Sequence, residues 1–279
     1  MPQRRAVPSR QVARATAEAE RAGLACGVFW SGQLDDGLLV IVDRRTEELR
    51  YRASRDLDTI TEWIADAAVD TVPVAATFAL VAHLWPLAGA ARAGARGNVL
   101  EAPMKRAAER LQAAAPAGVA LRHACERMRE CLVRHMAHLT AREMTARLLL
   151  EARRIQRDDE ATRQELAEQA ARRLPAGTVL TVGSDAVAAV IHAHRTGGRA
   201  QALVPEGRPS AAGTRLAAPA LLRAGVPVRV CADAAVAALM ARGQVQAVLC
   251  GVERIAANGD VAAVIGTYAV AALAAQHGI

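Results

Sequence analysis

Apolar residues in the C-terminal half recur in short runs separated by segments with helical spacing. Each run predicts a strand, and each segment after it predicts a helix. The expected strands span 178–182, 199–204, 226–230 and 247–250, and the expected helices 185–195, 213–224, 234–241 and 266–276. Strands that alternate with helices of this length are typical of a parallel sheet. The sequence therefore predicts a Rossmann-like α/β domain here.

The N-terminal half follows a different pattern. Short β-like runs at 26–30, 38–42 and 48–52, with turn residues between the first two, predict a small antiparallel sheet. Helices with an apolar stripe are expected over 56–68, from Pro73 onward, over 98–113 and over 119–157 with a break near Thr140. The start is charged and Ala-rich, which favours a frayed helix or a flexible segment. The expected division is 1–23, a β-hairpin plus helical domain over 24–160, and the Rossmann-like domain over 161–279.

Composition narrows the function classes. The formal charge is +7 and the pI about 9.9, as in many nucleic-acid-binding proteins. However, the basic residues are almost all Arg, spread among Asp and Glu, and aromatics make up only 3%. Too few rings remain to stack bases, so a solvated, salt-bridged surface is the favoured interpretation. The closest approach to a membrane span, 69–91, is interrupted by Asp70, Pro73, His83 and Pro86, so no membrane association is expected.

The five cysteines, Cys26, Cys125, Cys131, Cys231 and Cys250, form no CxxC pair and no zinc-site spacing. No metal or other cofactor is expected. An odd number of cysteines without a signal peptide favours reduced thiols in the cytoplasm. Cys250 ends a predicted strand, and there we prefer a small apolar core residue over a nucleophile.

Ligands of open parallel sheets bind beyond the carboxyl ends of the strands. The loops there read VGSD (182–185), VPEGRP (204–209), CADAAVAALM (231–240) and CGVERIAANGD (250–260), followed by IGTY (265–268). Arg208 could hold a phosphate, or could instead form an ion pair with Glu206 or Asp233. Asp233 and Glu253 could form an acid–base pair, although Asp233 could instead cap the following helix. Residues 258–260 are more typical of a turn than of a ligand site.

These loops resemble those of the superfamily that contains methylthioribose-1-phosphate isomerase, ribose-1,5-bisphosphate isomerase and initiation factor 2B. Its members show an ETRP-like loop, a D-x-A/M loop before a helix of small residues, and GADRI, ANGD and IGTY in this order. Here the corresponding segments read EGRP, DAA, GVERI, ANGD and IGTY. The match runs from about Glu143 to Ile279, and a fainter one begins at Leu38.

The resemblance implies conversion of an aldose 1-phosphate to a ketose 1-phosphate, with a cysteine and an aspartate moving the proton or hydride. The cysteine position falls at Gly183 and the aspartate position at Glu253, so both groups differ here. The family's RGAP anion turn falls at Asp70-Thr71-Val72-Pro73 and lacks its arginine. Six residues remain for contacts to substrate or phosphate: Ser184, Arg208, Asp233, Arg254, Asn258 and Asp260.

Three hypotheses follow. The first is an isomerase-like protein that binds a phosphorylated sugar, or a nucleotide, with catalysis altered or lost. The second is a non-catalytic regulatory or partner-binding subunit similar to initiation factor 2B, and the third, a nucleic-acid binder, is disfavoured. The resemblance also implies a homodimer through the C-terminal domain and one further strand beyond Ile279.

Overall fold

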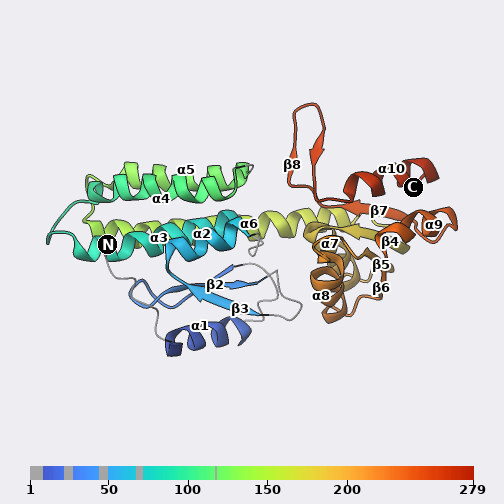
Figure 1. The fold of residues 1–279 in the computed structure, drawn as a ribbon, viewed down its shortest axis with the longest axis horizontal. Helices are drawn as coiled ribbons and strands as arrows, with labels where there is room; N and C mark the ends of the chain where they lie inside the picture. Colours follow the sequence, from blue (N-terminus) through green and yellow to red (C-terminus); the bar gives the residue numbers. More distant parts are fainter. Residues whose placement is uncertain (1–8, 22–27, 44–49, 67–71, 117) are drawn as a thin grey trace. The chain divides into compact units, whose positions relative to one another are not determined.

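The computed structural model describes residues 9–21, 28–43, 50–66, 72–116 and 118–279 (Figure 1). Its contacts divide the chain into two units, residues 1–159 and 160–279. Each unit has hydrophobic clusters of its own. Several expectations fall on residues outside the described ranges: Cys26, the start of the expected strand at 48, and Asp70-Thr71.

Unit 1 contains the expected antiparallel sheet, with the order β1-β2-β3. Its strands are β1 (Val28–Ser31), β2 (Leu38–Val42) and β3 (Tyr51–Ser54). Every residue of β2 is buried, because its alternating side chains face two different layers. Leu38 and Val40 pack on helix α1 (Ser9–Arg21), whereas Leu39 and Ile41 join the main core of the unit.

Helices form the rest of unit 1. They are α2 (Leu57–Ala65), α3 (Val72–Ala90), the 3-10 turn η1 (Gly97–Leu100), α4 (Glu101–Ala114), α5 (Val119–His135) and the N-terminal part of α6 (Ala141–Ala171). Asp56 caps α2, since its carboxylate accepts a hydrogen bond from the Thr59 amide at 2.9 Å. The helix expected over 56–68 thus begins at its first expected residue.

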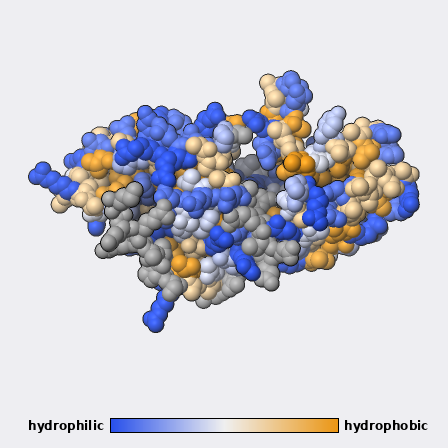
Figure 2. Space-filling model, in the orientation of Figure 1, coloured by the Kyte–Doolittle hydropathy of each residue, from blue (hydrophilic) through white to orange (hydrophobic). Residues whose placement is uncertain are grey.

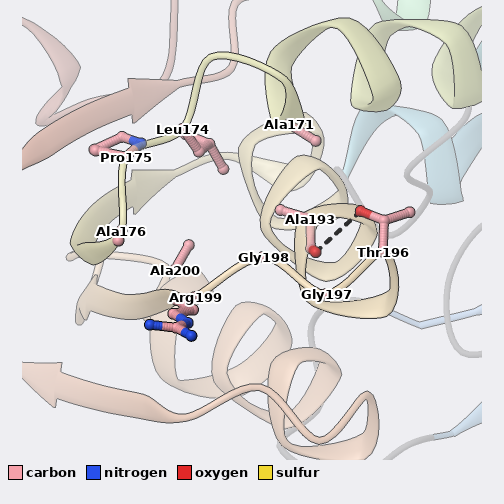
Figure 3. Close-up of a pocket in the computed structure, with 10 residues that line it drawn as sticks. All are labelled: Ala171, Leu174, Pro175, Ala176, Ala193, Thr196, Gly197, Gly198, Arg199 and Ala200. Carbon is pink, nitrogen blue, oxygen red and sulfur yellow. Dashed lines mark hydrogen bonds between the residues drawn. The ribbon is translucent and has the colours of Figure 1, made fainter.

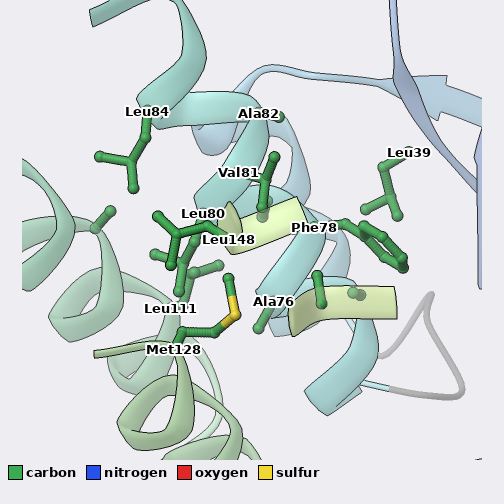
Figure 4. Close-up of a cluster of buried hydrophobic side chains, with 14 of the residues drawn as sticks. Leu39, Ala76, Phe78, Leu80, Val81, Ala82, Leu84, Leu111, Met128 and Leu148 are labelled. Atoms are coloured by element: carbon green, nitrogen blue, oxygen red, sulfur yellow. The ribbon is translucent and has the colours of Figure 1, made fainter. Parts of the chain in front are cut away.

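Helix α3 is the centre of this core. Figure 4 shows Phe78 of α3 beside Leu39 of the sheet, and Leu80 on the side of Leu111 and Met128. The helix continues through Pro86, so an apolar run that looked interrupted in the sequence forms one element of 19 residues. By length and composition alone it would suffice to cross a membrane, but most of it is buried within unit 1.

Helix α6 extends beyond its expected end at Arg157, to Ala171, and the division between the units falls inside it. Residues 158–171 contain neither Gly nor Pro, so no residue in this stretch terminates a helix. The first breakers come at Pro175 and Gly177, where the first strand of unit 2 begins.

Unit 2 is an α/β domain around a parallel sheet, as the sequence predicts, and its strand order is β6-β5-β4-β7. The strands are β4 (Gly177–Val182), β5 (Ala200–Pro205), β6 (Val228–Cys231) and β7 (Ala247–Cys250). The helices are α7 (Ser184–Arg195), α8 (Ala218–Arg223), α9 (Val236–Ala241) and α10 (Thr267–His277). Val179 and Leu180 belong to different clusters, so both sheet faces are covered.

Two local features differ from the expectation. The helix expected over 213–224 begins as a π-helical turn, Gly213–Ala217, before α8. Pro219 has no amide hydrogen, and therefore a regular α-helical ladder cannot pass through it. A short hairpin of β8 (Arg254–Ile255) and β9 (Val261–Ala262) also lies between β7 and α10. It projects from the sheet in Figure 1.

Candidate functional site at the carboxyl rim of the sheet

The carboxyl ends of the four parallel strands place the candidate loops along one edge, here called the carboxyl rim. Val182, Pro205, Cys231 and Cys250 are the last residues of their strands. After β4 the chain adds β5 and β6 on one side and then β7 on the other. The strand order thus reverses at β4 and β7, which is where ligands of such sheets bind.

Gly183 and Gly251 meet at this reversal. Gly183 has φ of +95°, and a Cβ atom added to it would lie 3.2 Å from the Gly251 Cα atom. The Gly251 amide donates a hydrogen bond to the Val182 carbonyl at 2.7 Å, which holds the second glycine against the end of β4. At the position where the resemblance implies a cysteine, there is therefore only backbone, with little room for a side chain.

Helix α7 starts directly after Gly183, and no side chain caps it. Its first amide groups have no partner within the helix, and the helix dipole adds a positive partial charge at this end. Ser184 is exposed at the first position. Asp185 in the same turn lies 3.8 Å from Arg163 of α6. The start of α7 thus provides donors suited to an oxyanion at the carboxyl rim.

The loops after β5 and β6 bind each other. The Asp233 carboxylate accepts hydrogen bonds from the amides of Gly207 and Arg208, both at 2.9 Å. The cap of the short helix after β6 is Ala232, so the hypothesis that Asp233 caps this helix is wrong. The Arg208 Nε atom donates to the Glu206 carboxylate at 3.0 Å, which is one of the two ion pairs considered from the sequence.

Glu253, the expected acid–base partner of Asp233, makes none of these contacts and lies on the segment that leads into the hairpin. The Glu253 amide donates to the Ala262 carbonyl at 2.8 Å, and the Glu253 side chain is exposed. Arg254 opens β8 and is also exposed. No described contact joins Glu253 to Asp233, so the structure does not present the two carboxylates as a hydrogen-bonded pair.

Residues 258–260 form a turn, as the sequence favours. The Asn258 side-chain amide donates to the Asp260 carboxylate at 2.8 Å, and the Asp260 amide donates back to the Asn258 side chain at 3.1 Å. Gly259 supplies the left-handed conformation with φ of +89°. These groups are engaged with each other at the end of the hairpin, and they do not line a common pocket with Arg208.

Cys250 fits the apolar interpretation. Its side chain is partly buried, and burial raises the pKa of its thiol above the ordinary value. The thiolate, which is the nucleophilic form, is therefore scarcer at neutral pH than for an exposed cysteine. Among the described residues, no group of three or more His, Cys, Asp or Glu side chains could hold a metal ion.

Two hydroxyl groups near this region were missed by sequence reasoning. Thr181 near the end of β4 and Thr267 at the start of α10 are buried, and neither side-chain oxygen has a hydrogen-bond partner in the described structure. Buried polar groups are usually paired, so these hydroxyls are available donors and acceptors. A threonine in the apolar run VLTV was the only signal for the first of them.

A cavity in unit 2 lies elsewhere. It has a volume of about 330 Å³ and is lined by the end of α6, the end of α7 and the amino ends of β4 and β5 (Figure 3). Arg199 and Thr196 are its polar side chains. Because it adjoins the amino ends of the strands, it is separate from the carboxyl rim.

Comparison with known proteins decides the family. The model of the "Initiation factor 2 subunit family" matches residues 74–279, which is most of the chain. The chain belongs to this family. Methylthioribose-1-phosphate isomerase from Thermus thermophilus is 36% identical over 260 residues, covering 88% of this chain and 71% of that protein. The protein of that name from Nitratidesulfovibrio vulgaris is 40% identical over 186 residues, covering 61% and 52%.

Solved structures of family members agree. The 5-methylthioribose 1-phosphate isomerase from Pyrococcus horikoshii superposes with a TM-score of 0.75 at 27% identity, covering 91% of this chain and 73% of that one. The delta subunit of translation initiation factor eIF-2B from A. fulgidus gives a TM-score of 0.72 at 25% identity, covering 91% and 75%. The family therefore includes both isomerases and initiation-factor subunits with the fold of this chain.

Proposed function

We propose that this family member binds a phosphorylated sugar at the carboxyl rim of unit 2 and that its isomerase chemistry is altered or lost. The Gly183–Gly251 contact carries this proposal. A side chain at residue 183 would be strained, because φ is +95° and a Cβ atom would lie 3.2 Å from the Gly251 Cα atom. A catalytic step that needs a cysteine at this position therefore cannot operate, whereas the backbone donors at the start of α7 remain.

Phosphate binding is supported by the low cost of releasing Arg208. Its side chain is 69% exposed, and its ion pair with Glu206 is of the surface type. Such pairs contribute only about 0–1 kcal/mol, so a phosphate that offers two acceptor oxygens can compete for the guanidinium. Asp233 fixes the loop backbone from which Arg208 extends, and this fixes the origin of the arginine side chain.

A binding and turnover experiment tests the proposal. Isothermal titration with 5-methylthioribose 1-phosphate is expected to show saturable binding that weakens at least tenfold in Arg208→Ala. Arg223→Ala removes the same charge from α8, where this arginine bonds only the Pro219 carbonyl among the contacts described, and should bind normally. Absence of binding, or equal weakening by both variants, would refute a phosphate site at Arg208.

Turnover of the same compound is read by NMR. The proposal expects none at the rate of a competent isomerase, and any residual turnover should disappear in Glu253→Gln, because Glu253 occupies the position of the family's aspartate. Turnover that is efficient, or that is unaffected by this substitution, would contradict the altered-site proposal.

A second candidate function, assembly with another copy of the chain, is favoured by a specific surface. Four apolar side chains on the hairpin and at the start of α10 are more than half exposed; they are Ile255, Val261, Ile265 and Tyr268, and together they are called the hairpin patch. Figure 2 shows apolar residues around the base of the hairpin. Exposed apolar surface of this kind marks interaction sites.

Light scattering after gel filtration tests this candidate. The double substitution Ile265→Ser and Tyr268→Ser should convert a dimer to a monomer, whereas Leu222→Ser, at an equally apolar and 64% exposed position on α8, should not. A wild-type chain that is monomeric at micromolar concentration would exclude assembly through this patch.

A further inference from the structure

Four arginines gather on one side of the helix pair α5–α6, entirely within unit 1. Arg127 and Arg134 lie seven residues apart on α5, and Arg147 and Arg154 lie seven apart on α6. Seven residues are close to two helical turns, so each pair shares one helix face. All four line a cavity of about 280 Å³, here called the arginine groove.

Carboxylates account for one end of the arginine groove. Arg127 contacts Glu151 at 2.8 Å and Asp158 at 2.7 Å, and Arg154 contacts Glu151 at 3.5 Å. Two arginines therefore share two carboxylates there, and the local charge is balanced. This end needs no further anion.

The other end is not balanced. Within the described ranges, no acidic side chain lies within the 4.0 Å ion-pair distance of Arg134 or Arg147. Glu130 also lines the cavity, four residues before Arg134 on α5, but among the described contacts it forms no ion pair with either arginine. The Arg147 guanidinium instead contacts the uncharged thiol of buried Cys131, and His135 completes the lining.

The two guanidinium groups line one cavity and carry the same charge, so they repel each other, although solvent screens part of this repulsion at the exposed Arg134. Arg134 has a structural explanation, since a cation in the last turn of α5 interacts well with the helix dipole. Arg147 lacks this dipole stabilisation, because it sits in the second turn of α6, near the positive end of that helix. An oxyanion placed between the two would remove the repulsion and accept planar, bidentate hydrogen bonds from both.

We infer that the arginine groove is a second anion site, separate from the carboxyl rim, which binds the phosphate group of a small phosphorylated molecule through Arg134 and Arg147. A cavity of about 280 Å³ accommodates a phosphate group with a small substituent and is too small for a folded partner. The site lies wholly in the helical unit, so its occupancy does not depend on the sugar-phosphate site proposed for unit 2.

Inorganic phosphate and pyrophosphate are suitable probes, titrated at constant ionic strength against the whole chain. Pyrophosphate is expected to bind saturably, and Arg134→Gln with Arg147→Gln should weaken it at least tenfold. The matched control is Arg122→Gln with Arg129→Gln. These two exposed arginines are also seven residues apart on α5 but on its opposite face, so both double variants lose two positive charges. Equal affinity of the two double variants would overturn the inference.

Hydrogen–deuterium exchange locates the bound anion without any substitution. Protection by pyrophosphate should appear in peptides within 127–154 and should persist in Arg208→Ala, which alters the carboxyl rim alone. Protection confined to 183–209 would assign the anion to the rim and refute the second site. Single-stranded RNA that binds while neither phosphate probe does would also refute it, in favour of a nucleic-acid surface.

Discussion

At the scale of single residues, the reversal point of the sheet gives the sharpest stability test. Gly183 and Gly197 have similar φ angles, +95° and +87°, but a Cβ on Gly183 would meet Gly251 whereas a Cβ on Gly197 meets nothing within 4 Å. We expect Gly197→Ala to cost about 1 kcal/mol from backbone strain alone, and Gly183→Ala about 2–3 kcal/mol. Urea unfolding followed by circular dichroism measures both, and equal costs would mean that the close approach to Gly251 is not tight.

Asp233 tests the tie between two rim loops. Its carboxylate accepts the amides of Gly207 and Arg208, so Asp233→Ala leaves both without their protein partner. Because the loop is exposed, water replaces part of the loss, and we expect a cost of about 1 kcal/mol with faster hydrogen exchange at both amides. Asp233→Asn keeps one acceptor oxygen and should show a smaller effect. Unchanged exchange in Asp233→Ala would show that the carboxylate does not hold this loop.

At the scale of elements, periodicity and breakers predicted the strands of the antiparallel and parallel sheets, because each is a short run of apolar or alternating residues near turn residues. Two features were not predicted: a short hairpin and the full length of one helix. The hairpin β8–β9 has strands of only two residues, too short for any alternation to be visible. Helix α6 exceeded its expected end because the sequence changes from apolar to charged near Arg157 without a helix breaker. Amphipathic periodicity shows which face of a helix is buried, and it does not show where an exposed continuation stops.

The start of α6 carries a pH prediction. Thr140 and Glu143 form a capping box, in which the Thr140 hydroxyl and amide donate to the Glu143 carboxylate at 2.7 and 2.8 Å. The hydroxyl first, and then the amide, lower the pKa of Glu143 below its ordinary value. Because the folded pKa is the lower one, this stabilisation is complete above the unfolded pKa of about 4.3 and is lost as the pH falls through the folded value.

Glu143→Gln should therefore lower the thermal midpoint of unit 1 at pH 7 and have a progressively smaller effect toward pH 3. Thr140→Ala should reduce the pH dependence that Glu143 contributes without abolishing it, because the hydroxyl donor is lost whereas the backbone amide of residue 140 still donates to the carboxylate. A difference between wild type and Glu143→Gln that is the same at pH 7 and pH 3 would contradict the capping box.

At the scale of the whole molecule, the sequence predicted which loops lie at the carboxyl rim but not which of their side chains contact each other. Parallel strands place their following loops on one edge whatever the side chains, so residues 183, 208, 233 and 253 could be assigned to it from the pattern alone. Which side chains then touch depends on loop conformation. Asp233 binds the backbone of the neighbouring loop, and Asn258 binds Asp260, contacts that periodicity does not encode. The arginine groove was missed for a related reason, since it needs the pairing of α5 with α6.

Because the two units have separate cores, we expect a core substitution in one unit to destabilise mainly that unit, and the positions of the tryptophans allow this to be measured. All three tryptophans, Trp30, Trp63 and Trp85, lie in unit 1, so tryptophan emission reports that unit while far-ultraviolet circular dichroism reports both. Leu80 and Leu203 are buried in the cores of units 1 and 2, and replacing either with Ala should cost about 2–5 kcal/mol in its own unit. Leu80→Ala should lower the unfolding midpoint seen by tryptophan emission. Leu203→Ala should leave that midpoint unchanged and lower only the part of the circular dichroism transition that comes from unit 2. If Leu203→Ala moves the tryptophan transition as far as Leu80→Ala does, the continuous helix α6 couples the units into one cooperative structure.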